Sequence, residues 1–303
     1  MNVIELNRLS KSFRDRVAVR DFNLQVEEGE VFGLLGRNGA GKSTTIKMML
    51  GLIAPDKGDI RLMSHDLGQE HNRAMERVGA LVERPSFYEY LTGRKNLQLL
   101  ARNFGNDFDR KSDELAERLG ILNRLNDKVS TYSQGMRQKL GIVLSLLPDS
   151  RLVVLDEPTN GLDPQGIREV RQFIREFAEQ GDVTVFLSSH LLSEVEQICT
   201  SLAVIEMGEV MVKGPISEMV KDENEIELQV GSVMQAIEII ESVCDSSVSA
   251  LPDNRLRLKL KSMTAAELNQ RLVDAGIEVS ELRPVKRTLE EYFLHLTGEG
   301  SGG

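Results

Sequence analysis

The chain has 303 residues, a formal net charge of −10 at pH 7 and a hydrophobic fraction of 41%. This length allows one large domain with a smaller one, and the composition is that of a globular protein. No apolar stretch approaches the roughly 20 residues of a membrane-spanning helix, and the amino terminus resembles no signal peptide, so we expect a cytoplasmic protein. The acidic balance argues against nucleic acid as a partner.

A glycine-rich stretch at 36–43 is the feature around which the chain is organised. It reads Gly-Arg-Asn-Gly-Ala-Gly-Lys-Ser and fits the pattern Gly-x4-Gly-Lys-Ser/Thr. An apolar run at 31–35 precedes it, and apolar residues at helical spacing follow it at 44–50, which predicts strand, loop and helix. Backbone N–H groups of such a loop surround phosphates, so we expect Lys42 to reach the outer phosphates of a nucleotide and Ser43 to bind magnesium. The alternative is an ordinary glycine-rich turn.

Two further residues near this loop are candidates for nucleotide contacts. Alternation at 3–7 and 22–26 predicts antiparallel strands, and Phe13 between them can stack on a purine base, although core positions are more common for phenylalanine. A strand-like run at 78–82 is followed by Glu83, whose carboxylate can approach the magnesium directly or through water. The equal alternative is that Glu83 is a solvated loop residue paired with Arg84.

Residues 95–146 are predicted to be largely helical, with a polar turn at 132–139 that opens an amphipathic helix. The hydroxyl of Ser133, the N–H of Gly135 and the helix amino terminus together form a possible second anion site. Considered alone, however, Ser133 is expected to be a simple helix cap.

Two acids follow an apolar run at 152–155, which predicts a buried parallel strand with carboxylates at its carboxyl end. Asp156 is expected to hold magnesium through water, and Glu157 to take a proton from the water that attacks the γ-phosphate. The alternative is that both acids cap a turn. A second buried strand at 183–187 leads to His190, which can donate to the γ-phosphate, although a lone histidine usually has a structural role.

Together, and in this order, these motifs resemble the nucleotide-binding domain of ATP-binding cassette (ABC) transporters over about residues 3–220. The resemblance implies an α/β P-loop cassette with a mainly parallel core sheet, an antiparallel β subdomain and a helical subdomain at about 84–148. Four segments carry it: a Walker A loop at 36–43, a Walker B strand at 152–156, a D-loop at 161–163 and the family signature at 133–138.

The resemblance implies ATP and Mg²⁺ as cofactors and assigns roles residue by residue. The implied catalytic residues are Glu157, the switch residue His190, and Lys42. The implied nucleotide-binding residues are Phe13, Gly36, Asn38, Gly39, Gly41, Lys42, Ser43, Thr44, Ser133, Gly135 and Asp163. The implied magnesium ligands are Ser43, Asp156 and Glu83.

The sequence departs from the family pattern at two places. In the signature, Gln134 replaces a glycine and Met136 replaces a glutamine, while the hydroxyl and the helix end are kept. At the Q-loop, Glu83 stands where the family usually has glutamine, which adds negative charge beside the magnesium. Residues 80–88 are similar to the branch that includes bacitracin, lantibiotic and sodium exporters.

The resemblance also implies the partners. Two copies of the chain would close head to tail as a homodimer, with each ATP between one copy's Walker A loop and the other's signature. One cassette without membrane spans implies separate transmembrane permease subunits, which would hold the dimer at the cytoplasmic face of the membrane and contact segment 84–100. Two alternatives are a cassette ATPase acting on ribosomes or DNA, and a ligand-regulated ATPase module.

The composition changes after a cassette at 1–221. Strand and helix patterns over 222–298 predict βαββαβ and a last helix at 289–296, a small α+β ferredoxin-like domain with a flexible tail at 299–303. This domain would stabilise the dimer, contact the permease or bind a small regulator. One predicted strand face carries three cations that either bind an anion or are solvated: Arg255, Arg257 and Lys259.

Overall fold

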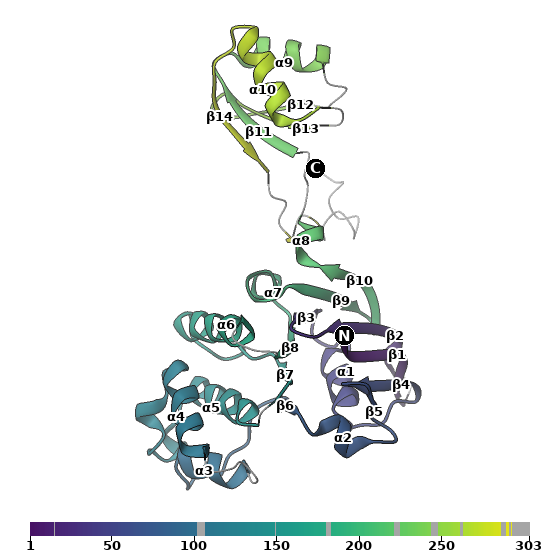
Figure 1. Cartoon of the computed structure of the whole chain (residues 1–303), viewed down its shortest axis with the longest axis vertical. Coiled ribbons are helices and arrows are strands. Elements are labelled where there is room, and N and C mark those ends of the chain that lie inside the picture. Colours follow the sequence, from purple (N-terminus) through teal and green to yellow (C-terminus); the bar gives the residue numbers. More distant parts are fainter. Residues whose placement is uncertain are drawn as a thin grey trace. The chain divides into compact units, whose positions relative to one another are not determined.

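A computed structural model describes most of the chain in two compact units, Met1–Ile216 and Ser217–Gly303 (Figure 1). The described residues are all except 15, 102–106, 149, 180–182, 221–224, 244–247, 261–262, 286–288, 291 and 293–303. The division at Ile216 precedes the boundary expected at 221. Among the described residues, no helix is both long and apolar enough to cross a membrane.

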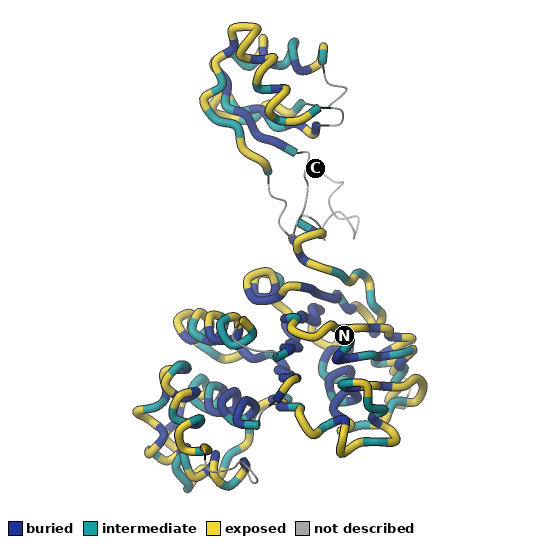
Figure 2. The backbone as a smooth tube through the Cα atoms, viewed as in Figure 1, coloured by how far each residue is buried: buried dark blue, intermediate teal, exposed yellow. Residues whose placement is uncertain are grey.

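A six-stranded sheet forms the centre of the first unit, in the order β10-β9-β3-β8-β7-β6. Its strands are β3 (Val31–Leu35), β6 (Val78–Leu81), β7 (Leu152–Asp156), β8 (Thr184–Ser189), β9 (Ser201–Glu206) and β10 (Glu209–Pro215). All neighbours pair in parallel except β9 and β10. Every residue of β3, β7 and β8 is buried, which explains the continuous apolar runs within them (Figure 2).

A four-stranded antiparallel sheet, ordered β2-β1-β4-β5, packs beside this centre. Its strands are β1 (Asn2–Phe13), β2 (Arg16–Glu27), β4 (Lys57–Leu62) and β5 (His65–Asp66). Helices α1 (Lys42–Met49) and α2 (His71–Met75) accompany it. One apolar core joins side chains of β1, β2 and α1 to β3, β7 and β8, so the phosphate loop between β3 and α1 is fixed on both sides.

The remaining helices of this unit include the predicted helical subdomain. Helices α3, α4 and α5 lie together, away from the antiparallel sheet (Figure 1). Their bounds are α3 (Gly93–Leu100), α4 (Phe108–Arg118) and α5 (Gln134–Leu146), followed along the chain by α6 (Pro164–Glu179) and α7 (Leu192–Ile198). Helix α8 (Ile216–Met219) begins at the last residue of this unit. The predicted α/β class with a mainly parallel core sheet, an antiparallel subdomain and a helical subdomain is confirmed.

The second unit has the predicted βαββαβ order. Its elements are β11 (Glu225–Val230), α9 (Val233–Val243), β12 (Val248–Leu251), β13 (Arg255–Lys259), α10 (Ala265–Asp274) and β14 (Val279–Pro284). They form an antiparallel sheet in the ferredoxin-like order β12-β13-β11-β14, with alternate strand residues buried against both helices. Most of the helix expected at 289–296 lies outside the described residues.

The other face of this sheet carries an ion-pair cluster around the buried carboxylate of Glu227. Arg255, Arg257 and Arg283 lie 3.3, 3.9 and 3.1 Å from its oxygens. Arg255 and Arg257, which the sequence placed on one strand face, are therefore engaged in ion pairs with Glu227. The pKa of Glu227 lies below its usual value, mainly because Arg283 donates a hydrogen bond to the carboxylate.

Candidate active site

The loop between β3 and α1 has the backbone shape that the glycine pattern predicts. Gly39 and Gly41 have φ of 82° and 114°, in the left-handed region that favours glycine. A Cβ on Gly41 would lie 2.5 Å from the carbonyl oxygen of Ala18, so a side chain is excluded there. Helix α1 begins directly after this turn, and the first N–H groups of a helix have no partner within the helix, so they are suited to a phosphate.

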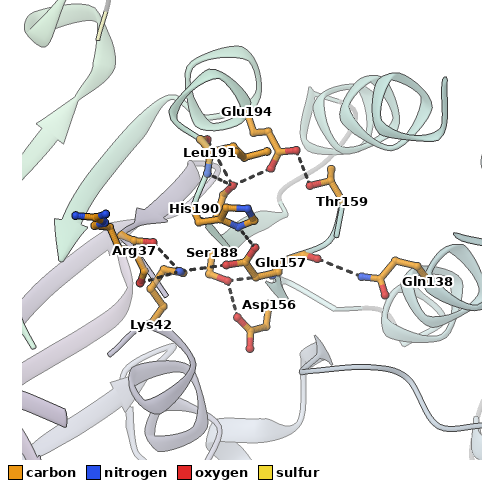
Figure 3. A network of polar contacts seen from close by, with 12 residues as sticks. Arg37, Lys42, Gln138, Asp156, Glu157, Thr159, Ser188, His190, Leu191 and Glu194 are labelled. Atoms are coloured by element: carbon orange, nitrogen blue, oxygen red, sulfur yellow. Dashed lines mark hydrogen bonds and ion pairs between the residues drawn. The ribbon is translucent and has the colours of Figure 1, made fainter. Parts of the chain in front are cut away.

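Lys42 lies buried at the start of α1 and points back into the loop. Its Nζ donates to the carbonyl oxygen of Gly36 at 2.7 Å and lies 3.1 Å from Oε1 of Glu157 (Figure 3). Its side chain is only 4% exposed, so the Glu157 carboxylate supplies the counter-charge that a buried ammonium requires. The structure thus brings these two predicted catalytic residues into direct contact.

Both acids predicted at the end of β7 are held by Ser188 of β8. The Ser188 hydroxyl donates to Asp156 Oδ1 at 2.5 Å and accepts from the Glu157 N–H at 3.0 Å. Glu157 has φ of 51°, an uncommon conformation for a residue with a side chain, and its Oε2 lies 2.5 Å from Nδ1 of His190. The alternative of a simple turn cap does not describe this arrangement, because both carboxylates make specific contacts within the site.

A glutamine that the sequence reasoning missed connects α5 to the same loop. The Nε2 of buried Gln138 donates to the carbonyl oxygens of Glu157 and Pro158 at 3.3 and 3.2 Å (Figure 3). A second missed residue is Ser188, which lies one position beyond the predicted strand at 183–187. The sequence signal for Ser188 was a polar residue directly after an apolar run.

The residues of the signature and D-loop cap helices within this chain. The Ser133 hydroxyl is exposed and accepts from the Met136 N–H at 3.2 Å, which confirms the predicted cap of α5. Asp163 Oδ1 accepts from the Gly166 N–H at 2.7 Å at the start of α6. These contacts leave the outer surface of both helix ends accessible.

Phe13 lies at the tip of the β1–β2 hairpin, with 48% of its surface exposed, so the alternative of a core position is wrong. It pairs across the hairpin with Arg16, whose guanidinium donates to the carbonyl oxygen of Gly39 at 2.9 Å. Asn38 is exposed and Thr44 half-buried. An exposed ring therefore stands on the hairpin that contacts the phosphate loop.

The three predicted magnesium ligands, Ser43, Glu83 and Asp156, line one cavity of about 610 Å³. Glu83 has φ of 59°, and its carboxylate forms an ion pair with Lys47 of α1, so the expected pairing with Arg84 is wrong in its partner. Among the described residues, no group of three or more His, Cys, Asp or Glu can hold a metal ion alone. One hydroxyl and one buried carboxylate nevertheless suit Mg²⁺, which usually shares its coordination sphere with water and substrate phosphates.

Comparisons with known proteins agree with this geometry. The family model of ABC transporters matches residues 19–160. The chain is 39% identical to the uncharacterized ABC transporter ATP-binding protein YhcH of Bacillus subtilis over 98% of this chain and 96% of the relative. It is 35% identical to the bacitracin transport ATP-binding protein BcrA of Bacillus licheniformis over 99% of both. A solved ATP-binding subunit of an ABC transporter matches at 31% identity and a TM-score of 0.65, over 72% of this chain and 91% of that one.

The chain therefore belongs to the ATP-binding proteins of ABC transporters. It binds ATP, and its enzymatic activity is that of an ABC ATPase.

Proposed function

We propose that this chain is the motor subunit of an ABC exporter, which binds ATP with magnesium, hydrolyses it and drives a separate transmembrane permease. The observation that carries the proposal is the Glu157 carboxylate placed between Lys42 and His190 at the end of β7. Similarity to a bacitracin transport protein over nearly the whole chain supports export. The cargo would be a peptide antibiotic, another hydrophobic compound or a sodium ion.

In this mechanism, the phosphates of ATP replace Glu157 as the partner of Lys42. Released from that ion pair, the Glu157 carboxylate accepts a proton from the water that attacks the γ-phosphate. His190 orients the carboxylate and donates to the γ-phosphate. Ser43 and Asp156 would hold the magnesium ion, which neutralises phosphate charge when bound.

We propose further that two copies of the chain close head to tail. Exposed Ser133 at the amino end of α5 supports this arrangement, because its helix end can receive the γ-phosphate of ATP bound to the other copy. Gly135 and the D-loop residue Asp163 would lie in the same interface. Each copy would then complete the site of the other.

The surface proposed to receive the permease lies in segment 84–100. Tyr88 and Tyr90 are 45% and 68% exposed, and their rings meet edge to face with centroids 6.0 Å apart. Exposed aromatic pairs are typical of protein interfaces. Through this contact the chain would lie at the cytoplasmic face of the membrane.

The experiment uses Glu157→Gln to trap the ATP-bound dimer in gently solubilised membranes, followed by mass spectrometry of the proteins that co-purify. We expect a multi-span membrane protein, whose recovery is lost in Lys42→Ala and reduced in Tyr88→Ala. Recovery of ribosomal or DNA-bound material without a membrane protein would overturn the transport role and favour the alternative of a cassette ATPase that acts on ribosomes or DNA.

A further inference from the structure

We propose that Glu194 is a positioning residue for hydrolysis, which fixes the loop after Glu157 relative to the loop that carries His190. The proposal rests on the function proposed above for those two residues. Glu194 belongs to α7, and its side chain is only 4% exposed. It touches neither Glu157 nor His190 directly, so it acts through the segments on either side of them.

The carboxylate of Glu194 joins these two segments with separate oxygens. Oε1 accepts from the Thr159 hydroxyl at 2.7 Å, and Oε2 accepts from the Ser189 hydroxyl at 2.8 Å (Figure 3). Thr159 lies shortly after Glu157 in the chain, and Ser189 directly precedes His190. Both hydroxyl residues are buried. The Glu194 side chain therefore links the segment that follows Glu157 to the residue that precedes His190.

The charge of Glu194 is compensated by a third element. Arg171 of α6 places a guanidinium nitrogen 3.4 Å from Oε1 of Glu194 and donates to Gln197 at 2.7 Å. A buried carboxylate is costly unless it is paired and hydrogen-bonded, and these contacts satisfy both conditions. Helix α6 begins directly after Asp163 of the D-loop, so Glu194 is connected to three segments that carry residues of the candidate active site.

The geometry of the Glu157–His190 pair explains why such a link matters. Glu157 and His190 follow the ends of the neighbouring strands β7 and β8, and their side chains lie 2.5 Å apart. The last paired residues of these strands are Asp156 and Ser188, so backbone pairing alone does not fix the two side chains. Glu157 also holds a left-handed backbone conformation, which persists only where its surroundings impose it. Hydrolysis is sensitive to displacements of about 1 Å, which can cost on the order of 100-fold in rate. Loss of Glu194 would allow the two loops to shift independently.

The test compares Glu194→Ala and Glu194→Gln with Glu196→Ala, which removes an exposed carboxylate from the same helix. In the full-length chain we expect Glu194→Ala to lower kcat by at least about tenfold, with the Kd for ATP within about twofold of wild type. Glu194→Gln keeps one acceptor oxygen and should restore part of kcat. Glu196→Ala should match wild type in both quantities.

Unchanged kcat in Glu194→Ala, or a parallel loss of ATP binding and kcat, would overturn the proposal. An inactive wild-type chain would instead contradict the proposed function and not the role of Glu194. These outcomes are therefore distinguishable.

A milder variant keeps the proposal testable if Glu194→Ala does not fold. Thr159→Val is nearly isosteric and removes only one hydroxyl contact with Glu194. We expect it to lower kcat severalfold, and to add little when it is combined with Glu194→Gln, because both changes act on one hydrogen-bond network. Fully additive losses, or wild-type kcat in Thr159→Val, would contradict the positioning role.

Discussion

The Oε1 of Glu157 lies 3.1 Å from the Nζ of Lys42, so the carboxylate that we propose as the general base and the cation that we propose to bind phosphate form an ion pair. The other oxygen of the same carboxylate contacts Nδ1 of His190 at 2.5 Å. Glu157 therefore occupies the position from which it would act on water, but its charge is directed at the group that ATP must engage. In the proposed mechanism, ATP binding exchanges this ion pair for contacts between Lys42 and phosphate.

This exchange predicts the affinity of Glu157→Gln for ATP. Replacing the carboxylate removes the competitor for Lys42 and one negative charge near the phosphates, so we expect the Kd for ATP to fall severalfold. Equilibrium binding at fixed salt measures the effect. Glu209→Gln is the matched control for net charge, because Glu209 is exposed and paired with Arg20. Equal or weaker binding by Glu157→Gln would contradict the competition.

The contacts of Ser188 predict a loss of both stability and metal-dependent binding in Ser188→Ala. The substitution leaves the Glu157 N–H without its hydroxyl acceptor and Asp156 without its donor. An unsatisfied buried group costs about 1–3 kcal/mol, so denaturant unfolding should show a decrease of that size. ATP binding in the presence of magnesium should weaken as well. Ser193→Ala, at an exposed position of α7, is the control and should leave both quantities unchanged.

The ion pairs of Glu227 predict a pH dependence of stability in the second unit. The hydrogen bond from Arg283 lowers the pKa of Glu227, so the charged form is favoured in the folded state. Its stabilisation is complete above the unfolded-state pKa of about 4.3 and is lost as the pH falls through the lower folded-state pKa. The stability difference between wild type and Glu227→Gln should therefore be constant near neutral pH and shrink in acid.

Urea unfolding at several pH values, with exposed Glu238→Gln as the control, measures this difference. A stability difference between wild type and Glu227→Gln that grows in acid would show that the pKa of Glu227 is raised by folding and not lowered. A difference that stays constant down to about pH 3 would show that the ion pairs do not hold the carboxylate in its charged form.

Much of the fold and of the site could be predicted because local patterns encode them. The spacing of glycines with Lys42 defines the phosphate loop, and continuous apolar sequences define the buried strands. The alternating strands of the second unit predicted its topology, since each one had to bury a single face. Asp156 and Glu157 follow a strand end and could be placed at the carboxyl edge of the sheet.

The support of the site could not be predicted, because it depends on contacts between distant segments. Gln138 and Glu194 lie on helices whose patterns do not reveal which loop each polar side chain meets. The ion pair between Glu83 and Lys47 likewise joins the Q-loop to α1, whereas the sequence suggested the neighbouring Arg84 or magnesium as the partner of Glu83. Buried polar groups must find partners, but the sequence alone does not identify them.

The most direct test of the account is ATP hydrolysis by the purified full-length chain and by Glu157→Gln at saturating ATP and magnesium. We expect steady turnover by wild type and near-complete loss of hydrolysis in Glu157→Gln, with ATP binding retained, because the carboxylate that accepts the proton from water is removed. Wild-type turnover in Glu157→Gln would contradict the assignment of Glu157 as the general base and, with it, the proposed mechanism.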